Sequence, residues 1–176
     1  MGQYYYPIIL DSEGKIVAWM CAHEYSNGLK LMEHSFIGNN FVSAFEWGLT
    51  PKGSFHKSRV VWAGDYADVE ESGETLYTLC EEDTHITPPS YTVDYPYIVN
   101  HTKKQFVDKD KVSANRAGYK IHPLPLLTCE GNGRGGGDYR PEDHPLIGIW
   151  ARDVISVEKE KPDGYVEIAF DLIEQF

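Results

Sequence analysis

The sequence predicts an α+β fold in one domain, residues 1–176, with a mainly antiparallel β-sheet and two short α-helices. Runs rich in aromatic and β-branched residues outnumber segments with helical periodicity. Short turn sequences connect several of these runs, as in β-hairpins. The chain has 176 residues, of which 41% are apolar, and this is enough for a hydrophobic core. We find no internal repeat and no low-complexity linker that would divide it.

The first part of the chain predicts a hairpin followed by a helix. Tyr4–Leu10 and Ile16–Ala22 are apolar runs, and the residues 11–14 between them have the turn sequence Asp-Ser-Glu-Gly. A helix is predicted near 39–49, because four apolar residues share one face and an asparagine can cap its N-terminus. Pro51 ends this helix.

The middle of the chain predicts a strand at Ser58–Ala63, which a Gly-Asp pair ends. A short acidic helix is predicted around Glu74–Glu82. Residues 84–96 contain three prolines and predict an irregular loop. Tyr97–His101 and Gln105–Val107 predict a second hairpin.

The last part of the chain predicts mostly strands. Two prolines limit Ile121–Thr128 to an extended segment at the edge of a sheet. Ile147–Val157 predicts a long strand, and Tyr165–Phe170 predicts the last one after a turn. Asp171–Phe176 predicts a helical tail.

Charge is distributed unevenly along the chain, whose formal net charge is -11. Residues 60–102 contain nine Asp or Glu and no Lys or Arg. Such a block produces a field that attracts basic partners and repels nucleic acid. One interpretation is a surface that binds a basic groove. The other is a solvated acidic face that keeps the protein in solution.

The segment around Gly131–Gly137 is the most unusual in composition, since five of these seven residues are glycine. Its backbone N–H groups can form a concave binding site for phosphate, with Arg134 as a forked cation. The pattern differs from a phosphate-binding Walker loop, because Asp138 follows the last glycine where that loop has Lys and Ser or Thr. A flexible surface loop is the alternative.

Cysteine and histidine patterns predict no metal site and no cofactor. The three cysteines are widely spaced, which favours reduced, mostly buried thiols, with Cys129 as an alternative nucleophile. The seven histidines form no metal-binding motif. The triplets 56–58 and 85–87 read His-x-Ser and His-x-Thr, which are typical of two-histidine phosphodiesterases but are also expected of ordinary surface or core histidines.

Six stretches, spread over nearly the whole chain, resemble sequences of a known protein family. They are MGQYY at 1–5, GLKLMEHS at 28–35, WAGDYA at 62–67, NHTKK at 100–104, LTCEGNGRGGGDY at 127–139 and WARDVISV at 150–157. With these stretches the chain resembles a family of small proteins carried by bacteriophages and gut Firmicutes. The resemblance implies no catalytic residues. By analogy, the phage setting implies an inhibitor of host defence, such as an anti-CRISPR protein that blocks a Cas nuclease.

We therefore expect a non-enzymatic, phage-type inhibitor of a bacterial defence system that targets nucleic acid. The acidic protein would occupy the basic groove of a nuclease effector. The expected contact residues are Asp65, Asp68, Glu70, Glu71, Glu74, Glu81, Glu82 and Asp83. We expect no direct binding of nucleic acid.

The alternative is a protein that binds a nucleotide or cyclic nucleotide, to sequester it or to hydrolyse a phosphodiester. Its expected contact residues are Gly131, Asn132, Gly133, Arg134, Gly135, Gly136, Gly137 and Asp138. The chain lacks an apolar run of the roughly 20 residues that a membrane helix needs, and its start lacks the features of a signal peptide. The expected location is the cytoplasm of a bacterial host cell.

Overall fold

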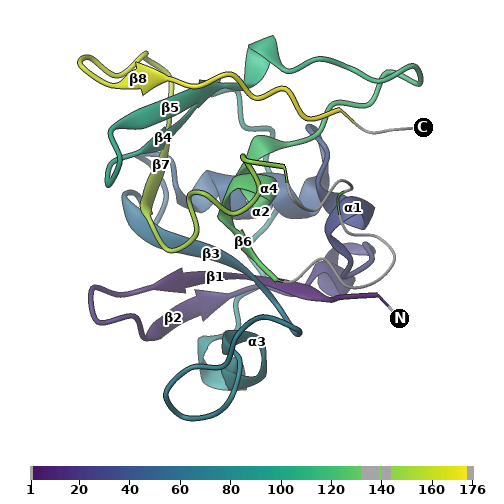
Figure 1. Ribbon diagram of the computed structural model, residues 1–176, viewed down its shortest axis with the longest axis vertical. Coiled ribbons are helices and arrows are strands. Elements are labelled where there is room, and N and C mark those ends of the chain that lie inside the picture. Colours follow the sequence, from purple (N-terminus) through teal and green to yellow (C-terminus); the bar gives the residue numbers. More distant parts are fainter. Residues whose placement is uncertain (1, 132–138, 140–143, 174–176) are drawn as a thin grey trace.

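The computed structural model describes residues 2–131, 139 and 144–173. Its strands are β1 (Tyr5–Leu10), β2 (Ile16–Trp19), β3 (Ser58–Gly64), β4 (Tyr97–Asn100), β5 (Gln105–Asp108), β6 (Cys129–Glu130), β7 (Val154–Glu158) and β8 (Val166–Glu167). They form one sheet in the order β2-β1-β3-β7-β4-β5-β8, and β6 pairs with β3 outside this path (Figure 1). Five of the seven strand pairs are antiparallel, so the predicted α+β class with a mainly antiparallel sheet is confirmed.

β3 joins the two parts of the sheet. It pairs antiparallel with the whole length of β1, from Gly64 opposite Tyr5 to Arg59 opposite Leu10. On its other edge, the start of β3 pairs with β7 and its end pairs parallel with β6. The residues from Val60 to Ala63 are buried on both faces of the sheet, as expected for a strand at the centre of a fold.

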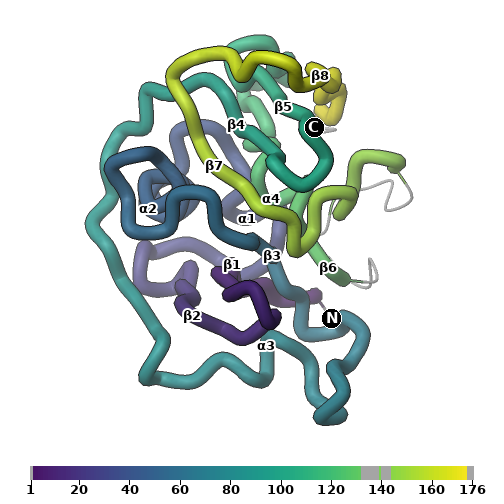
Figure 2. Tube along the Cα trace, turned by 90° about the vertical axis from the view of Figure 1, so that its left-hand side faces the viewer, coloured from purple at the N-terminus to yellow at the C-terminus, as the bar shows by residue number. Residues whose placement is uncertain are grey.

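The structure has four α-helices in its described part: α1 (Leu31–His34), α2 (Asn40–Gly48), α3 (Leu76–Leu79) and α4 (Pro123–Thr128). The strands curve around α2 and α4, which lie between the β1–β3 part and the β4–β5 part of the sheet (Figures 1 and 2). The predicted cap of α2 is confirmed, because the Asn39 side chain accepts hydrogen bonds from the N–H groups of Phe41 and Val42.

A buried histidine connects α1 to the sheet. Trp62 Nε1–H donates to His34 Nε2 over 2.9 Å, so the imidazole proton lies on Nδ1, which is 3.0 Å from the Gly28 carbonyl oxygen. Burial lowers the pKa of His34 to about 4, although the bond to Gly28 acts in the opposite direction. The ring is therefore neutral at pH 7 and serves as a hydrogen-bonded part of the core.

The opposite face of the β2-β1-β3 part is covered by α3 and aromatic rings. Leu76 of α3 is buried in a cluster with Ile8 and Val61. Tyr77 stacks on Tyr6, with ring centroids 4.0 Å apart and an interplanar angle of 5°. These contacts hold α3 on the outside of the sheet.

The irregular loop predicted at 84–96 begins later than expected, because Thr84 ends a 3-10 helix at Glu82–Thr84 and His85 forms an isolated bridge with Trp19. Residues 86–96, which we call the crossing segment, contain no helix or strand, as predicted. Figure 2 shows the chain along the left side of the molecule, from the level of α3 to β4. The Ile86 N–H donates to the Trp19 carbonyl over 2.9 Å, and Ser90 Oγ donates to the Asn40 carbonyl over 2.8 Å. The Tyr25 hydroxyl donates to the Pro88 carbonyl. The crossing segment is thus tied to the β1–β2 region at one end and to α2 further along.

The predicted edge strand at 121–128 is wrong, because Pro123–Thr128 form α4 and all six residues are buried. Both prolines lie in the first turn of the helix, where backbone N–H groups have no acceptor within the helix, so the missing donors cost little. His122 caps the helix, since its Nδ1 accepts the Leu124 N–H over 3.2 Å.

Three other predicted elements are shorter than expected. β7 begins only at Val154, because Gly148 and Arg152 have φ values of 73° and 67°, which an extended strand does not contain. The helix predicted at 74–82 is reduced to α3, and the strand predicted at 165–170 is reduced to β8. Residues 171–173 of the predicted helical tail are not helical, and 174–176 lie outside the described residues.

Candidate functional site

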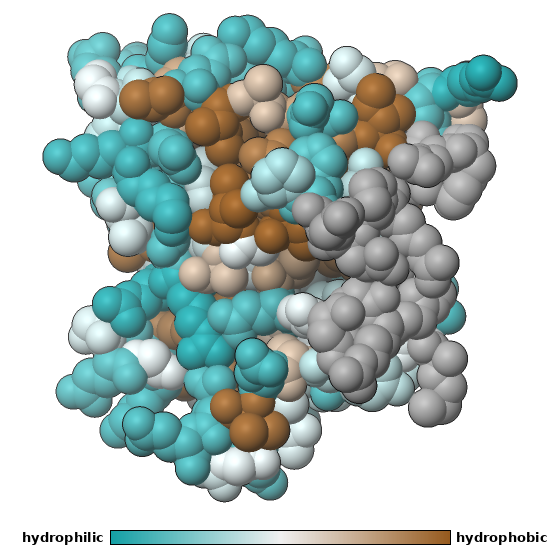
Figure 3. Space-filling view, viewed as in Figure 1, coloured by the Kyte–Doolittle hydropathy of each residue, from teal (hydrophilic) through white to brown (hydrophobic). Residues whose placement is uncertain are grey.

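The eight acids predicted to contact a partner lie in residues 65–83, which we call the acidic segment. This segment follows β3 and contains α3, at the lower end of the molecule in Figure 1. That end of the surface is largely hydrophilic in Figure 3. Six of the eight side chains are exposed, and in the described structure none of them forms an ion pair with a lysine or arginine: Asp68, Glu71, Glu74, Glu81, Glu82 and Asp83.

The other two acids have roles inside the protein. Asp65 Oδ1 accepts the Tyr4 N–H over 2.9 Å, next to the pairing of β1 with β3. Glu70 forms two hydrogen bonds with the Arg152 guanidinium, of 2.9 and 3.0 Å. Arg152 also binds both carboxylate oxygens of Glu130, over 2.6 and 2.8 Å. These hydrogen bonds raise the pKa of Arg152, and those to Glu130 have the larger effect. The positive charge of Arg152 is therefore used in ion pairs within the protein.

The glycine-rich segment predicted to bind a nucleotide is described only at Gly131, and residues 132–138 lie outside the described residues. Gly131 and Gly64 lie under the Gln3 amide: a Cβ atom would be 2.3 Å from Gln3 Oε1 at Gly131 and 2.1 Å from it at Gly64. Neither position has room for a side chain. Gln3 is fully buried and its amide atoms have no hydrogen-bond partner among the described residues.

A buried charged cluster, which the sequence analysis missed, lies on the other side of the core. Glu46 of α2 forms an ion pair with Lys109, and His122 Nε2 is 3.2 Å from the same carboxylate oxygen, Glu46 Oε2. The side chains of Glu46 and His122 are only 3% and 2% exposed. The three residues come from α2, from the turn after β5 and from the residue that caps α4, so only the tertiary fold brings them together.

The protonation of this cluster follows from its contacts. Because His122 Nδ1 accepts the Leu124 N–H, the proton of the neutral ring lies on Nε2. Burial lowers the pKa of His122. Burial by itself would raise the pKa of Glu46, but its interactions with His122 and Lys109 outweigh this and leave that pKa below its usual value. The cluster therefore contains a carboxylate–ammonium pair and a neutral imidazole.

The cluster forms one wall of a cavity of about 290 Å³, which we call the polar cavity. Asn40, Ser43 and Glu46 of α2 line it, because residues three apart lie on the same face of a helix. The opposite wall is the crossing segment from Ser90 to Val93. A cavity with a buried ionisable cluster in its wall is a common form of functional site.

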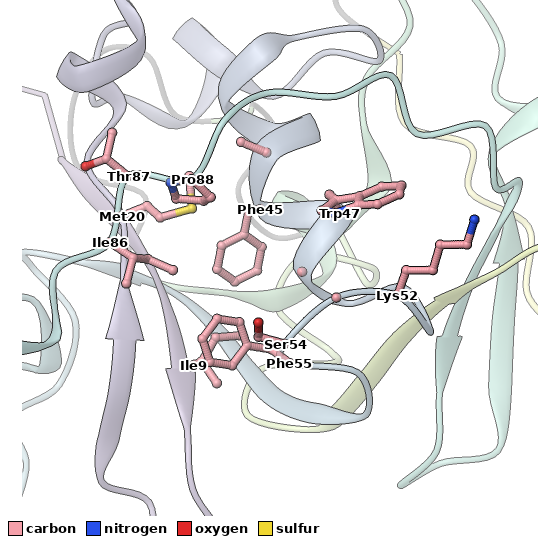
Figure 4. A pocket seen from close by; sticks show the side chains of 13 residues that line it. Ile9, Met20, Phe45, Trp47, Lys52, Ser54, Phe55, Ile86, Thr87 and Pro88 are labelled. Atoms are coloured by element: carbon pink, nitrogen blue, oxygen red, sulfur yellow. The ribbon is translucent and has the colours of Figure 1, made fainter.

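A second and more apolar cavity, of about 470 Å³, lies along another face of α2. Figure 4 shows Phe45 between Met20 and Ile86 on one side and Trp47 on the other, with Ile9 and Phe55 opposite the helix. Lys52 is its only charged lining residue. The crossing segment lines this cavity as well, at Ile86, Thr87 and Pro88, so α2 and the crossing segment bound both cavities.

The two His-x-Ser/Thr triplets lie in different surroundings. His56 Nε2 is 2.6 Å from Glu158 Oε2, whereas His85 stacks on Trp19 with ring centroids 4.3 Å apart. The imidazole hydrogen-bonded to a serine is instead His101, whose Nε2 is 2.7 Å from Ser156 Oγ. Ser156 is fully buried and so presents no accessible nucleophile.

Two of the three cysteines, Cys80 and Cys129, show no sign of a nucleophile. Cys129 is buried, and its Sγ donates to the Leu126 carbonyl over 3.3 Å. Burial raises the pKa of Cys80 to about 12, which disfavours its thiolate. In the described part of the chain, no group of three or more His, Cys, Asp or Glu is placed to hold a metal ion.

Comparisons with known proteins add no relative. The chain has no match among protein-family models, curated proteins or solved structures. Among the described residues, no helix has both the length and the apolar character needed to cross a lipid bilayer.

Proposed function

We propose that this protein binds a basic, nucleic-acid-binding partner through the acidic segment, and that it competes with nucleic acid for the partner's groove. This is the action of a phage-type, anti-CRISPR-like inhibitor of a nuclease effector. The observation that carries the proposal is the set of six exposed carboxylates within residues 68–83, none of which forms an ion pair with a lysine or arginine of the described structure. Such a set repels nucleic acid and attracts a surface that binds it.

The acidic segment also offers an apolar contact. Val69 is 60% exposed and lies between two acids in the sequence. Charges mainly accelerate association and orient the partner, whereas a desolvated apolar side chain contributes more to affinity. We therefore assign Val69 to the contact together with the six exposed carboxylates of the acidic segment.

The fold holds the acidic segment in place before binding. Leu76 is buried, Tyr77 stacks on Tyr6, and Arg152 joins Glu70 to Glu130 at the end of β6. A surface that is already ordered loses less conformational entropy when it binds. This supports recognition by a preformed surface.

Cleavage of DNA by a panel of guide-loaded Cas nucleases tests the proposal. We expect the wild-type protein to inhibit at least one nuclease, and the inhibition to weaken as salt is raised. Replacing Glu71, Glu74, Glu81 and Glu82 with lysine should weaken inhibition at least about tenfold.

The matched control replaces four exposed acids outside the segment with lysine: Glu13, Glu24, Glu160 and Asp163. Both variants have the same net charge, so only the position of the charges differs. Equal inhibition by the two variants, or inhibition of no nuclease in the panel, would contradict the proposal.

A further inference from the structure

We propose that the polar cavity binds an uncharged ligand with two adjacent hydroxyl groups, a vicinal diol of the kind found in a monosaccharide or in the ribose of a nucleoside. The cavity lies between α2 and the crossing segment and is lined by Ser43, Glu46, Tyr91, Lys109 and His122, among others. None of its lining residues belongs to the acidic segment. The inference is therefore independent of the proposed function.

Two polar atoms in the cavity wall have unused hydrogen-bonding capacity, and one of them, His122 Nε2, is buried without a hydrogen-bond partner among the described residues. Lys109 and His122 both contact Oε2 of Glu46, and no described residue donates a hydrogen bond to Oε1. His122 Nε2 is buried and has no hydrogen bond of acceptable geometry, although it lies 3.2 Å from Glu46 Oε2. An unsatisfied buried polar atom such as His122 Nε2 costs about 1–3 kcal/mol, so a bound molecule that satisfies it is favoured.

The chemistry of these atoms selects the ligand. Glu46 Oε1 can only accept a hydrogen bond, whereas Nε2 of the neutral His122 ring can only donate one, because the Leu124 N–H occupies Nδ1. A hydroxyl group donates and accepts at the same time. Two adjacent hydroxyls can bind a carboxylate and a neighbouring donor together, and carboxylates bind ribose hydroxyls in this way in dinucleotide sites.

The charge of the wall selects an uncharged ligand. Glu46 and Lys109 compensate each other and His122 is neutral, so these three residues together carry no net charge. An ion that entered the cavity would lose hydration without gaining an uncompensated counter-charge. An uncharged polyol loses much less hydration free energy than an ion when it enters the cavity.

The rim and the volume of the polar cavity favour a ligand with one sugar ring. Tyr91 lines the cavity, is 49% exposed, and has its ring centroid 5.1 Å from that of Trp47. An exposed aromatic ring offers a flat apolar surface to the C–H groups of a sugar. The volume of about 290 Å³ is just below the range of roughly 300–1,000 Å³ typical of drug-sized ligands.

Saturation-transfer NMR with the full-length protein tests this proposal. The probes are ribose, glucose, adenosine and uridine, together with 2′-deoxyadenosine and 2′-deoxyuridine, which lack the vicinal diol. We expect at least one diol to bind with a Kd of about 1 mM or less, and its deoxy analogue to bind about 3–10-fold more weakly because one hydrogen bond is lost. Ribose and glucose report a free sugar as the source, and adenosine and uridine report a nucleoside.

Two variants locate the site without removing the buried charges. Ser43→Met fills the cavity and should weaken binding at least about tenfold, and Tyr91→Ala should weaken it about 3–10-fold. The controls are Thr87→Met, at the neighbouring apolar cavity, and Tyr119→Ala, at another exposed tyrosine. Both controls should bind as the wild type does, and thermal unfolding confirms that each variant is folded.

Three results would overturn the proposal: no probe binds at about 10 mM, a deoxy analogue binds as well as its diol, or Ser43→Met binds as well as Thr87→Met. The first result would mean that the two unused polar atoms are satisfied by water only. None of these results bears on nuclease inhibition by the acidic segment, so the two proposals fail separately.

Discussion

Carboxylates in this protein occupy two opposite environments. The acidic segment exposes six of them without a lysine or arginine ion pair in the described structure, whereas Glu46 is 3% exposed and is surrounded by Lys109 and His122. Water solvates an exposed charge at little cost, but a buried charge must be compensated by its neighbours. The exposed acids can therefore contact a partner, whereas the Glu46 carboxylate contributes to the fold and to the wall of the polar cavity.

The largest expected effect is on the buried side of this comparison. Lys109→Ala leaves the Glu46 carboxylate buried without its counter-charge, and should lower the free energy of unfolding by about 3–5 kcal/mol. Lys111→Ala is the control, because its pair with Glu167 lies at the surface, with side chains 66% and 30% exposed. That variant should lose much less in the same urea titration, because water screens an exposed ion pair. If both variants lost the same free energy of unfolding, burial would not make the Lys109–Glu46 pair more important than the exposed Lys111–Glu167 pair.

His34 sharpens the comparison, because here burial keeps a group neutral rather than charged. Its pKa of about 4 lies below the ordinary value of 6.5, so the unfolded chain binds a proton between these pH values that the native protein does not. Stability should therefore be complete above pH 6.5 and should fall as the pH drops toward 4. This one group should cost about 2 kcal/mol at pH 5.

The measurement is the difference in the free energy of urea unfolding between pH 7 and pH 5. His34→Gln should show a smaller difference than the wild type, because it has no imidazole to protonate on unfolding. The exposed His23→Gln is the control and should keep the wild-type difference. An unchanged difference in His34→Gln would show that other groups cause the pH dependence.

Arg152 lies between the two extremes, since its side chain is 35% exposed. Arg152→Ala removes the cation that joins Glu70 to Glu130, and should lower the free energy of unfolding by about 1–2 kcal/mol after allowance for solvent screening. Arg116→Ala, at an exposed arginine, should change it by less than about 0.5 kcal/mol. A loss in Arg152→Ala that grows with added salt would argue against an ionic role, since salt weakens ion pairs.

The smallest effect on stability is expected in the acidic segment itself. Replacing Glu71, Glu74 and Glu81 one at a time with glutamine should change the free energy of unfolding by less than about 0.5 kcal/mol each, because these side chains are exposed and form no ion pair with a described lysine or arginine. Thermal unfolding measures this. A loss above about 1 kcal/mol would show that the carboxylate stabilises the fold, as Glu70 does, and is not simply part of an exposed contact surface.

Local patterns in the sequence predicted the elements that depend on local chemistry. The hairpins at β1–β2 and β4–β5 follow from strand-like runs joined by turns, and α2 follows from its apolar periodicity and the Asn39 cap. The exposure of the acids from 71 to 83 agrees with the preference of charged residues for water. In each case the neighbours along the chain were sufficient for the prediction.

Elements that depend on distant contacts were missed. The two prolines of α4 suggested an extended chain, and the helix forms because His122 caps it and the core buries every residue from Pro123 to Thr128. Glu46 offered one local signal, because it is the one charged residue of α2 and lies between Phe45 and Trp47. Its importance depends on Lys109 and His122, which are 63 and 76 residues away in the sequence.

By itself, the sequence determined that this chain forms an antiparallel α+β fold and carries a block of exposed negative charge, because alternation, turn chemistry and solvation act over a few neighbouring residues. Only the tertiary structure decided which charges are buried. It removed Glu70 from the exposed set by placing Arg152 beside it, and it assembled Glu46, Lys109 and His122 around a cavity. Compensation of a buried charge is a matter of distance in space, and distance along the chain does not predict it.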